Sequence, residues 1–101
     1  MNVSLSRGSC SYGAVYVRPG SSDYAWWNFT LPPVTGQVRD GSYSYHLPPG
    51  SYQILFHRVP GCQNGFSVRV DRPGSPPQTF TGDSVSVTLG PEDTLWITAR
   101  Y

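Results

Sequence analysis

The chain has 101 residues, of which 13% are charged, and a formal net charge of +1 at pH 7. Such a near-neutral balance excludes the strongly basic surface that attracts nucleic acids and anionic lipids, so neither is an expected partner. The length fits a single domain, 1–101, and no apolar run approaches the ~20 residues that cross a bilayer.

Turn-forming and aromatic residues dominate the composition. The chain contains 11 Gly and 10 Pro, its aromatic content is 14%, and alanine occurs only at positions 14, 25 and 99. Alanine-rich helical stretches are therefore missing, whereas aromatic residues between frequent turn formers are typical of strands. We expect an all-β domain without a helix longer than one turn.

Alternation of apolar and polar residues predicts the first strands. Val3 and Leu5 alternate with serines, and Val15 and Val17 share one face of a strand predicted for 12–18. The most aromatic predicted strand covers 24–31. Its two faces carry Ala25, Trp27, Phe29 and Leu31 on one side and Tyr24, Trp26, Asn28 and Thr30 on the other. A brief strand or edge segment is expected at 36–39.

The stretch 41–57 predicts a β-hairpin around which the other strands are organised. Tyr43, Tyr45 and Leu47 alternate with polar residues before the sequence Pro-Pro-Gly-Ser, and Tyr52, Ile54 and Phe56 alternate with Gln53, Leu55 and His57 after it. Pro49 suits the second position of a tight turn, and Gly50 can take the positive φ that type II geometry requires next. The two strands are therefore expected to pair with each other.

Four further strands are predicted in the second half of the chain. They cover 65–71, with Phe66, Val68 and Val70 facing inward, a weak segment at 79–81, 84–89, and 94–101. Seven to nine short strands spaced by about ten residues predict a single small antiparallel β-sandwich.

Residues 40–54, Asp-Gly-Ser-Tyr-Ser-Tyr-His-Leu-Pro-Pro-Gly-Ser-Tyr-Gln-Ile, resemble the "G-x-Y-x-F-x-x-L-P-P-G-x-Y-x-V" signature of prealbumin-like β-sandwiches. These include the carboxypeptidase regulatory-like domain and the collagen-adhesin B-type repeats. The resemblance implies an Ig-like or prealbumin-like sandwich and says little about function. The lysine-to-asparagine crosslink that such adhesin repeats often carry is excluded, because the chain has no lysine.

Cys10 and Cys62 are the only cysteines, and two interpretations of them stay open. They form a disulfide if the protein is secreted, or remain two buried thiols if it is cytosolic. A zinc site is not expected, because two cysteines and two separated histidines lack the usual ligand spacing.

The residues of catalysis are not grouped in this sequence. In the predicted hairpin, His57 lies opposite Ser42 and away from His46, and the acidic residues occupy turns, where they solvate the chain or cap backbone amides. Since no phosphate-binding loop precedes a helix, we expect a protein that is not an enzyme and that uses no cofactor.

Two features are binding candidates: an outer aromatic surface, and the stiff proline-rich loops at 18–20, 31–33 and 72–77. Tyr24 and Trp26, with Trp96 of the last strand, are predicted to form an exposed aromatic surface, and large exposed rings suit protein interfaces or sugar stacking. Asn28 is predicted to lie beside these rings. Arg72 and Arg100 are the candidate arginines of an interface made of aromatic and arginine side chains.

The leading functional hypothesis is a structural or interaction module that docks on a larger protein assembly, such as a capsid-decorating or tail-associated virion protein, and is oligomeric there. The alternative is a carbohydrate-binding module in which exposed aromatic rings stack on sugars. A second alternative is a small secreted inhibitor with a stiff proline loop.

The first residues bear on localisation. The start Met-Asn-Val-Ser-Leu-Ser-Arg lacks the sections of a secretory signal, which predicts cytosolic production, with the virion as one destination, or secretion if a signal was removed.

Overall fold

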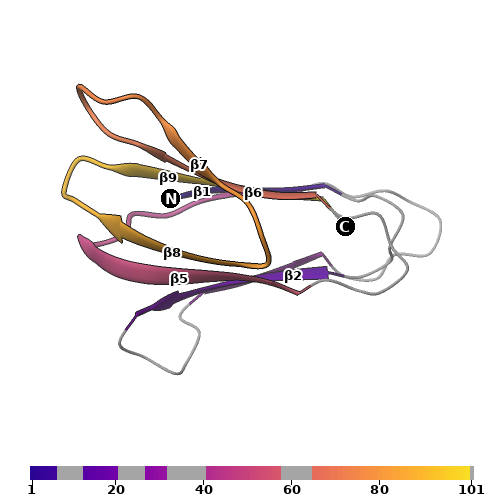
Figure 1. Ribbon diagram of the computed structural model, residues 1–101. Helices are drawn as coiled ribbons and strands as arrows, with labels where there is room; N and C mark the ends of the chain where they lie inside the picture. The colour runs from indigo at the N-terminus through magenta and orange to yellow at the C-terminus, as the bar shows by residue number, and fades with distance from the viewer. Residues whose placement is uncertain (7–12, 21–26, 32–40, 58–64, 101) are drawn as a thin grey trace.

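The computed structural model describes residues 1–6, 13–20, 27–31, 41–57 and 65–100, and their regular structure is entirely β (Figure 1). The strands are β1 (Asn2–Ser6), β2 (Gly13–Pro19), β3 (Trp27–Leu31), β4 (Gly41–Ser44), β5 (Gly50–His57), β6 (Gly65–Asp71), β7 (Gln78–Phe80), β8 (Ser84–Leu89) and β9 (Thr94–Arg100). None of the described residues belongs to a helix that could cross a membrane.

The strands form two stacked sheets. Sheet A has the order β4-β1-β9-β6-β7 and sheet B the order β3-β2-β5-β8, so the predicted all-β sandwich is confirmed. Figure 1 shows β1, β9 and β6 in one layer and β2, β5 and β8 in the other. The strand bounds predicted for β6 and β8 agree with the structure.

One pairing departs from the predicted antiparallel pattern. β1 pairs with β9 in parallel, with Asn2 beside Trp96 and Ser6 beside Arg100, while the other described strand pairs are antiparallel. The parallel register places the start of β1 next to the start of β9. Residues near Met1 therefore lie at the opposite end of sheet A from Arg100.

The core lies between the sheets and follows the period of two. In β8 and β9 every second residue is buried and the residues between them are mostly exposed. The buried apolar set is Met1, Val3, Leu5, Ala14, Val15, Val17, Phe29, Tyr52, Ile54, Phe56, Val68, Val70, Val85, Val87, Leu89, Leu95, Ile97 and Ala99. Because side chains alternate across a strand, this inner set leaves serines, threonines and arginines on the outer faces.

The predicted hairpin at 41–57 is wrong. β4 pairs with β1 in sheet A, whereas β5 pairs with β2 and β8 in sheet B. Ser42 lies opposite Ser4, and His57 lies opposite Ala14, so the expected pairing of His57 with Ser42 does not occur. The segment 45–49 instead carries the chain from one layer to the other.

The prolines explain why the chain changes layer at this point. Pro48 and Pro49 have no N–H, so a hairpin closed here would lack ladder donors next to its turn. A segment that crosses between sheets does not need backbone N–H donors for a strand ladder. Gly50 has a positive φ, but at 156° it is a stretched conformation at the start of β5 and not the ~80° of a type II turn.

Three hydrogen bonds hold the crossing segment. The Tyr52 hydroxyl donates to the carbonyl oxygen of Pro48 over 2.5 Å. On the other side, the Met1 amino group donates to the Tyr45 oxygen over 2.5 Å, and the Tyr45 N–H donates to the Met1 oxygen over 2.8 Å. Leu47 packs against the core between these anchors. The segment is thus fixed to both sheets.

A second crossing joins β8 to β9, and it depends on Asp93. Asp93 Oδ2 accepts hydrogen bonds from the Gly90 N–H at 2.8 Å and from Arg72 Nε at 3.0 Å. The Arg72 guanidinium also donates from Nη2 to the Thr88 oxygen at 2.8 Å. Arg72 follows β6 in sheet A and Thr88 belongs to sheet B, so this one side chain links the layers.

Several predictions fall outside the described residues. They are the segment 36–39, both cysteines, and Tyr24 and Trp26. The predicted disulfide and its alternative therefore stay predictions.

Replacing Ile54 tests the two-layer packing. Ile54 is fully buried in β5, whereas its neighbour Leu55 is only partly buried. I54A should lower the free energy of unfolding by about 2–5 kcal/mol, because it leaves a cavity between the sheets. L55A removes the same number of carbon atoms from the opposite face and should cost clearly less. Urea denaturation measures both, and equal losses would contradict the assignment of inner and outer faces.

The Asp93 carboxylate should make stability depend on acid. The Gly90 N–H, with help from Arg72, lowers the pKa of Asp93 below its ordinary value of ~3.9. Because the folded-state pKa is the lower one, this stabilisation is complete above about pH 4 and disappears as the pH falls through the folded value. D93N should lose the corresponding part of the pH dependence. Urea denaturation between about pH 5 and pH 2 measures it, with E92Q as the control for removing one negative charge from the turn; an unchanged acid slope in D93N would refute the role of Asp93.

Candidate functional site

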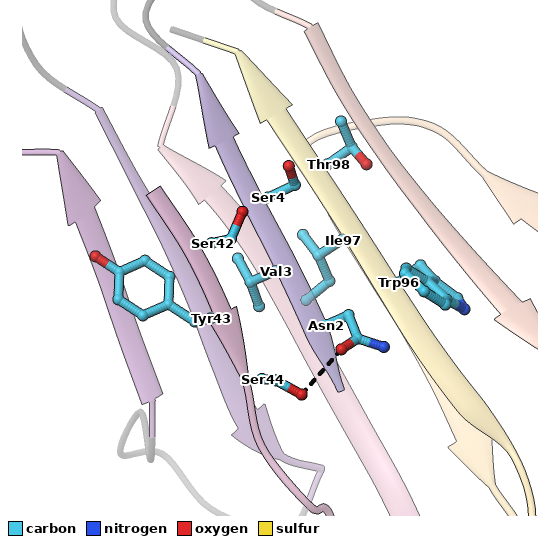
Figure 2. Close-up of a pocket in the computed structure, with 9 residues that line it drawn as sticks. All are labelled: Asn2, Val3, Ser4, Ser42, Tyr43, Ser44, Trp96, Ile97 and Thr98. Carbon is cyan, nitrogen blue, oxygen red and sulfur yellow. Dashed lines mark hydrogen bonds between the residues drawn. The ribbon is translucent and has the colours of Figure 1, made fainter. Parts of the chain in front are cut away.

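A shallow hollow of about 300 Å³ lies on the outer face of sheet A. Its lining comes from three neighbouring strands, β4, β1 and β9 (Figure 2). The residues are Asn2, Val3, Ser4, Ser42, Tyr43, Ser44, Trp96, Ile97 and Thr98. The strands of the hollow belong to the beginning, the middle and the end of the chain, so only the folded sheet brings them together.

The strand register arranges the outward side chains in two rows. Asn2 lies between Ser44 and Trp96, and in the next row Ser4 lies between Ser42 and Thr98. Val3 and Ile97 are buried, so they form the floor of the hollow with their backbone.

Tyr43 is a lining residue whose ring turns toward the inner side. Its centroid is 5.2 Å from that of Phe29 in the other sheet.

Trp96 is the only large apolar side chain exposed on the outer face of the described part of sheet A, with 40% of its surface accessible. The guanidinium carbon of Arg69, from the adjacent strand β6, lies 5.1 Å from the centre of the Trp96 ring. Asp71 holds Arg69 in turn, with Nε 3.1 Å from Oδ1 and Nη2 3.2 Å from Oδ2. An exposed contact of a cation with an aromatic ring is worth about 0.5–1 kcal/mol, which orients the indole.

The hollow offers hydroxyl and amide groups without net charge. The Ser44 hydroxyl donates to Asn2 Oδ1 at 3.0 Å, which leaves the amide nitrogen of Asn2 as a donor toward solvent (Figure 2). Ser4, Ser42 and Thr98 add hydroxyls that both donate and accept. The charge of Arg69 outside the hollow is balanced by Asp71. The chemistry available is hydrogen bonding to neutral polar groups beside an aromatic ring.

The outer face of sheet B differs because its polar groups bond to one another. Arg18 donates to Gln53 Oε1 from Nε at 2.9 Å and from Nη2 at 2.6 Å. Gln53 Nε2 donates to the Ser84 hydroxyl at 3.3 Å, and the hydroxyls of Ser51 and Thr88 are 3.2 Å apart. A second hollow, of about 330 Å³, lies on this face, but these internal bonds already use much of its hydrogen-bonding capacity.

The structure separates residues that were predicted to share one surface. Trp96 is exposed on sheet A, whereas Asn28 is exposed on sheet B, so the two lie on opposite outer faces. Arg100 is exposed on β9, two residues beyond Thr98. Arg72 uses its guanidinium internally, on Asp93 and Thr88.

Neither histidine belongs to a group of metal ligands among the described residues. His46 belongs to the crossing segment after β4, and His57 ends β5; both are exposed. Among residues 1–6, 13–20, 27–31, 41–57 and 65–100, no three His, Cys, Asp or Glu side chains gather as ligands.

Five polar lining residues and Arg69 were not identified as site residues from the sequence. Asn2, Ser4, Ser42, Ser44 and Thr98 could be assigned to outward faces from alternation alone. Their meeting could not be predicted, because it depends on β1 pairing with both β4 and β9 across the length of the chain.

Comparisons with known proteins add no relative. A scan against protein-family models finds no match, and searches among curated proteins and solved structures find none either.

Proposed function

We propose that the protein is a non-enzymatic binding module whose outer face of sheet A binds neutral glycan chains. The observation that carries this proposal is the exposed Trp96 ring beside a hollow lined by hydroxyl and amide groups. A sugar ring has apolar C–H faces and a rim of hydroxyls, so it needs both an aromatic surface and hydrogen-bonding partners that donate and accept.

The charges favour an uncharged ligand. No acidic or basic side chain lines the hollow, and the nearby guanidinium of Arg69 is paired with Asp71. A sulfated or uronic acid chain would gain no ion pair within this lining. Neutral hexose or pentose polymers are therefore the proposed ligand class.

The shape favours a chain that lies across the surface over an enclosed small molecule. The hollow is small, at the lower end of the ~300–1,000 Å³ of ligand pockets. Its polar walls are short serine and threonine side chains, and β4 is an edge strand of the described sheet A, so a polymer can continue beyond it. A few sugar units would contact Trp96 and the two polar rows.

Docking on a larger protein assembly, including a virion, is the second candidate function. Tyr45 and Tyr43 favour it, because they are 44% and 37% exposed beside β3 and lean on Phe29 with ring centroids 5.7 and 5.2 Å away. Exposed aromatic rings that are already held in place are frequent anchors of protein interfaces. This candidate uses the side of the sandwich and leaves the Trp96 face unused.

Affinity electrophoresis in gels that contain soluble neutral polysaccharides tests the glycan proposal. Xylan, glucomannan, galactomannan and β-glucan are suitable probes, with polygalacturonate as the charged comparison. Wild-type protein should be retarded by at least one neutral polymer. W96A should weaken that binding about tenfold or more, since a stacked aromatic anchor contributes on the order of 1–2 kcal/mol.

Y45A is the matched control, because it removes an equally exposed ring from a different surface. It should bind the polysaccharide as the wild type does, and thermal unfolding of both variants should confirm that they are folded. Retardation by none of the polymers, or equal weakening in W96A and Y45A, would refute the assignment of the Trp96 face.

A further inference from the structure

The indole of Trp96 has different neighbours on its two sides. In sheet A, Trp96 pairs with Asn2 of β1 on one side and with Arg69 of β6 on the other. Arg69 lies over the ring, with its guanidinium carbon 5.1 Å from the ring centre. Figure 2 shows the indole almost edge-on above β9, so the ring stands up from the strand. One face of the ring is therefore covered by Arg69, and the other is turned toward β1 and the hollow.

The contacts of Arg69 with Asp71 keep the guanidinium in this position. Arg69 Nε lies 3.1 Å from Asp71 Oδ1, and Nη2 lies 3.2 Å from Oδ2, so the carboxylate holds the guanidinium at two atoms. Asp71 Oδ1 is buried and has no hydrogen bond among the described residues, which leaves the guanidinium as its compensating charge. Because a buried carboxylate oxygen without such a charge is costly, we expect the pair to stay formed.

We infer that Arg69 and Asp71 are positioning residues that reserve the β1-facing side of the Trp96 ring for the ligand. This inference rests on the proposed function of the outer face of sheet A as a glycan-binding surface. The sugar ring stacks on the indole face that Arg69 leaves uncovered. The amide nitrogen of Asn2, whose Oδ1 is occupied by the Ser44 hydroxyl, donates to the hydroxyl rim of the same sugar.

The covered face is the less favourable place for a ligand. To stack there, a sugar would have to displace Arg69 and break both of its contacts with Asp71. On the β1-facing side, the next row of the sheet carries the short side chains Ser4 and Thr98. An indole that is held in advance also binds more tightly than one that must be ordered on binding, because immobilising a side chain costs entropy.

The affinity of variants for xylan, glucomannan, galactomannan or β-glucan, whichever retards the wild type, tests the positioning role. R69A should weaken that binding about two- to fivefold, the share of an exposed contact between a cation and a ring. D71N releases the guanidinium and should also weaken binding. R69K keeps a cation but lacks the planar fork that Asp71 holds, so its affinity should lie between those of R69A and the wild type.

R18A is the matched control. Arg18 is likewise held through Nε and Nη2, by Gln53 Oε1, but it lies on sheet B. R18A therefore removes the same charge and a similarly held side chain from the opposite outer face. It should bind the polymer as the wild type does, and thermal unfolding should confirm that each variant is folded.

The indole N–H of Trp96 gives a second readout, on the protein without ligand. Its NMR resonance is the indole signal that disappears in W96F, and its heteronuclear NOE measures how rigidly the ring is held. The NOE should fall in R69A and D71N and keep the wild-type value in R18A. A general loss of stability in a variant that is still folded would not loosen this one ring selectively.

Titration of the wild type with an oligosaccharide of the bound polymer identifies the ring face that is used. The side-chain amide resonance of Asn2 should shift, and that of the Arg69 Nε–H should change little. R69A that binds as tightly as the wild type or more tightly, a shift at Arg69 without one at Asn2, or an unchanged Trp96 NOE in R69A would each overturn the inference. Absence of binding to all four polymers would instead refute the glycan proposal, and the NOE would still decide whether Arg69 orients the ring.

Discussion

The covering of one apolar sheet face by another is the constraint on which this fold depends. Each sheet has one apolar face, and the chain must move between layers so that both faces point inward. The crossing at 45–49 carries the chain from sheet A to sheet B. It is fixed by a hydrogen bond from the Tyr52 hydroxyl to the Pro48 oxygen and by two hydrogen bonds between Met1 and the backbone of Tyr45. The crossing near Asp93 returns the chain from sheet B to sheet A, and Arg72 links the two layers there through its hydrogen bonds to Asp93 and Thr88. Both crossings use polar contacts to fix where apolar strands stack.

The inward packing determines what remains outside. Because side chains alternate, every buried valine or isoleucine in β1 and β9 leaves a small polar residue or Trp96 on the outer surface. The two outer faces then differ in how far their polar groups bond to one another. On sheet B, Arg18 and Gln53 bond within the surface, whereas the hollow on sheet A keeps hydroxyls directed to solvent. This difference is the reason why the proposed ligand is assigned to sheet A.

Local sequence patterns predicted the positions of the strands well. The pairing between strands was predicted wrongly at 41–57. The bounds of β6 and β8, and the inward set in β9, follow from alternation and from flanking turn residues. The same alternation at 41–57 fits two strands of a hairpin and two strands that belong to opposite layers. In both arrangements Tyr52 and Ile54 are buried, so burial could not distinguish them.

The candidate site shows the same limit. Trp96 was identified as exposed because it alternates with Leu95 and Ile97, but its neighbours Asn2 and Arg69 come from strands far away in the sequence. The expected partners Tyr24 and Trp26 lie outside the described residues, and Asn28 lies on the other face. A single sequence carries no signal for the parallel pairing of β1 with β9 that assembles the hollow.

That parallel pairing also determines how the molecule responds to mechanical load. A force that pulls apart Met1 and Arg100 acts along β1 and β9 in opposite directions, and the ladder bonds run between the two strands. The hydrogen bonds between β1 and β9, from Asn2 to Ser6, are then loaded in shear at the same time, so they do not break one after another. A stretched molecule should therefore resist with a single high rupture peak in force spectroscopy.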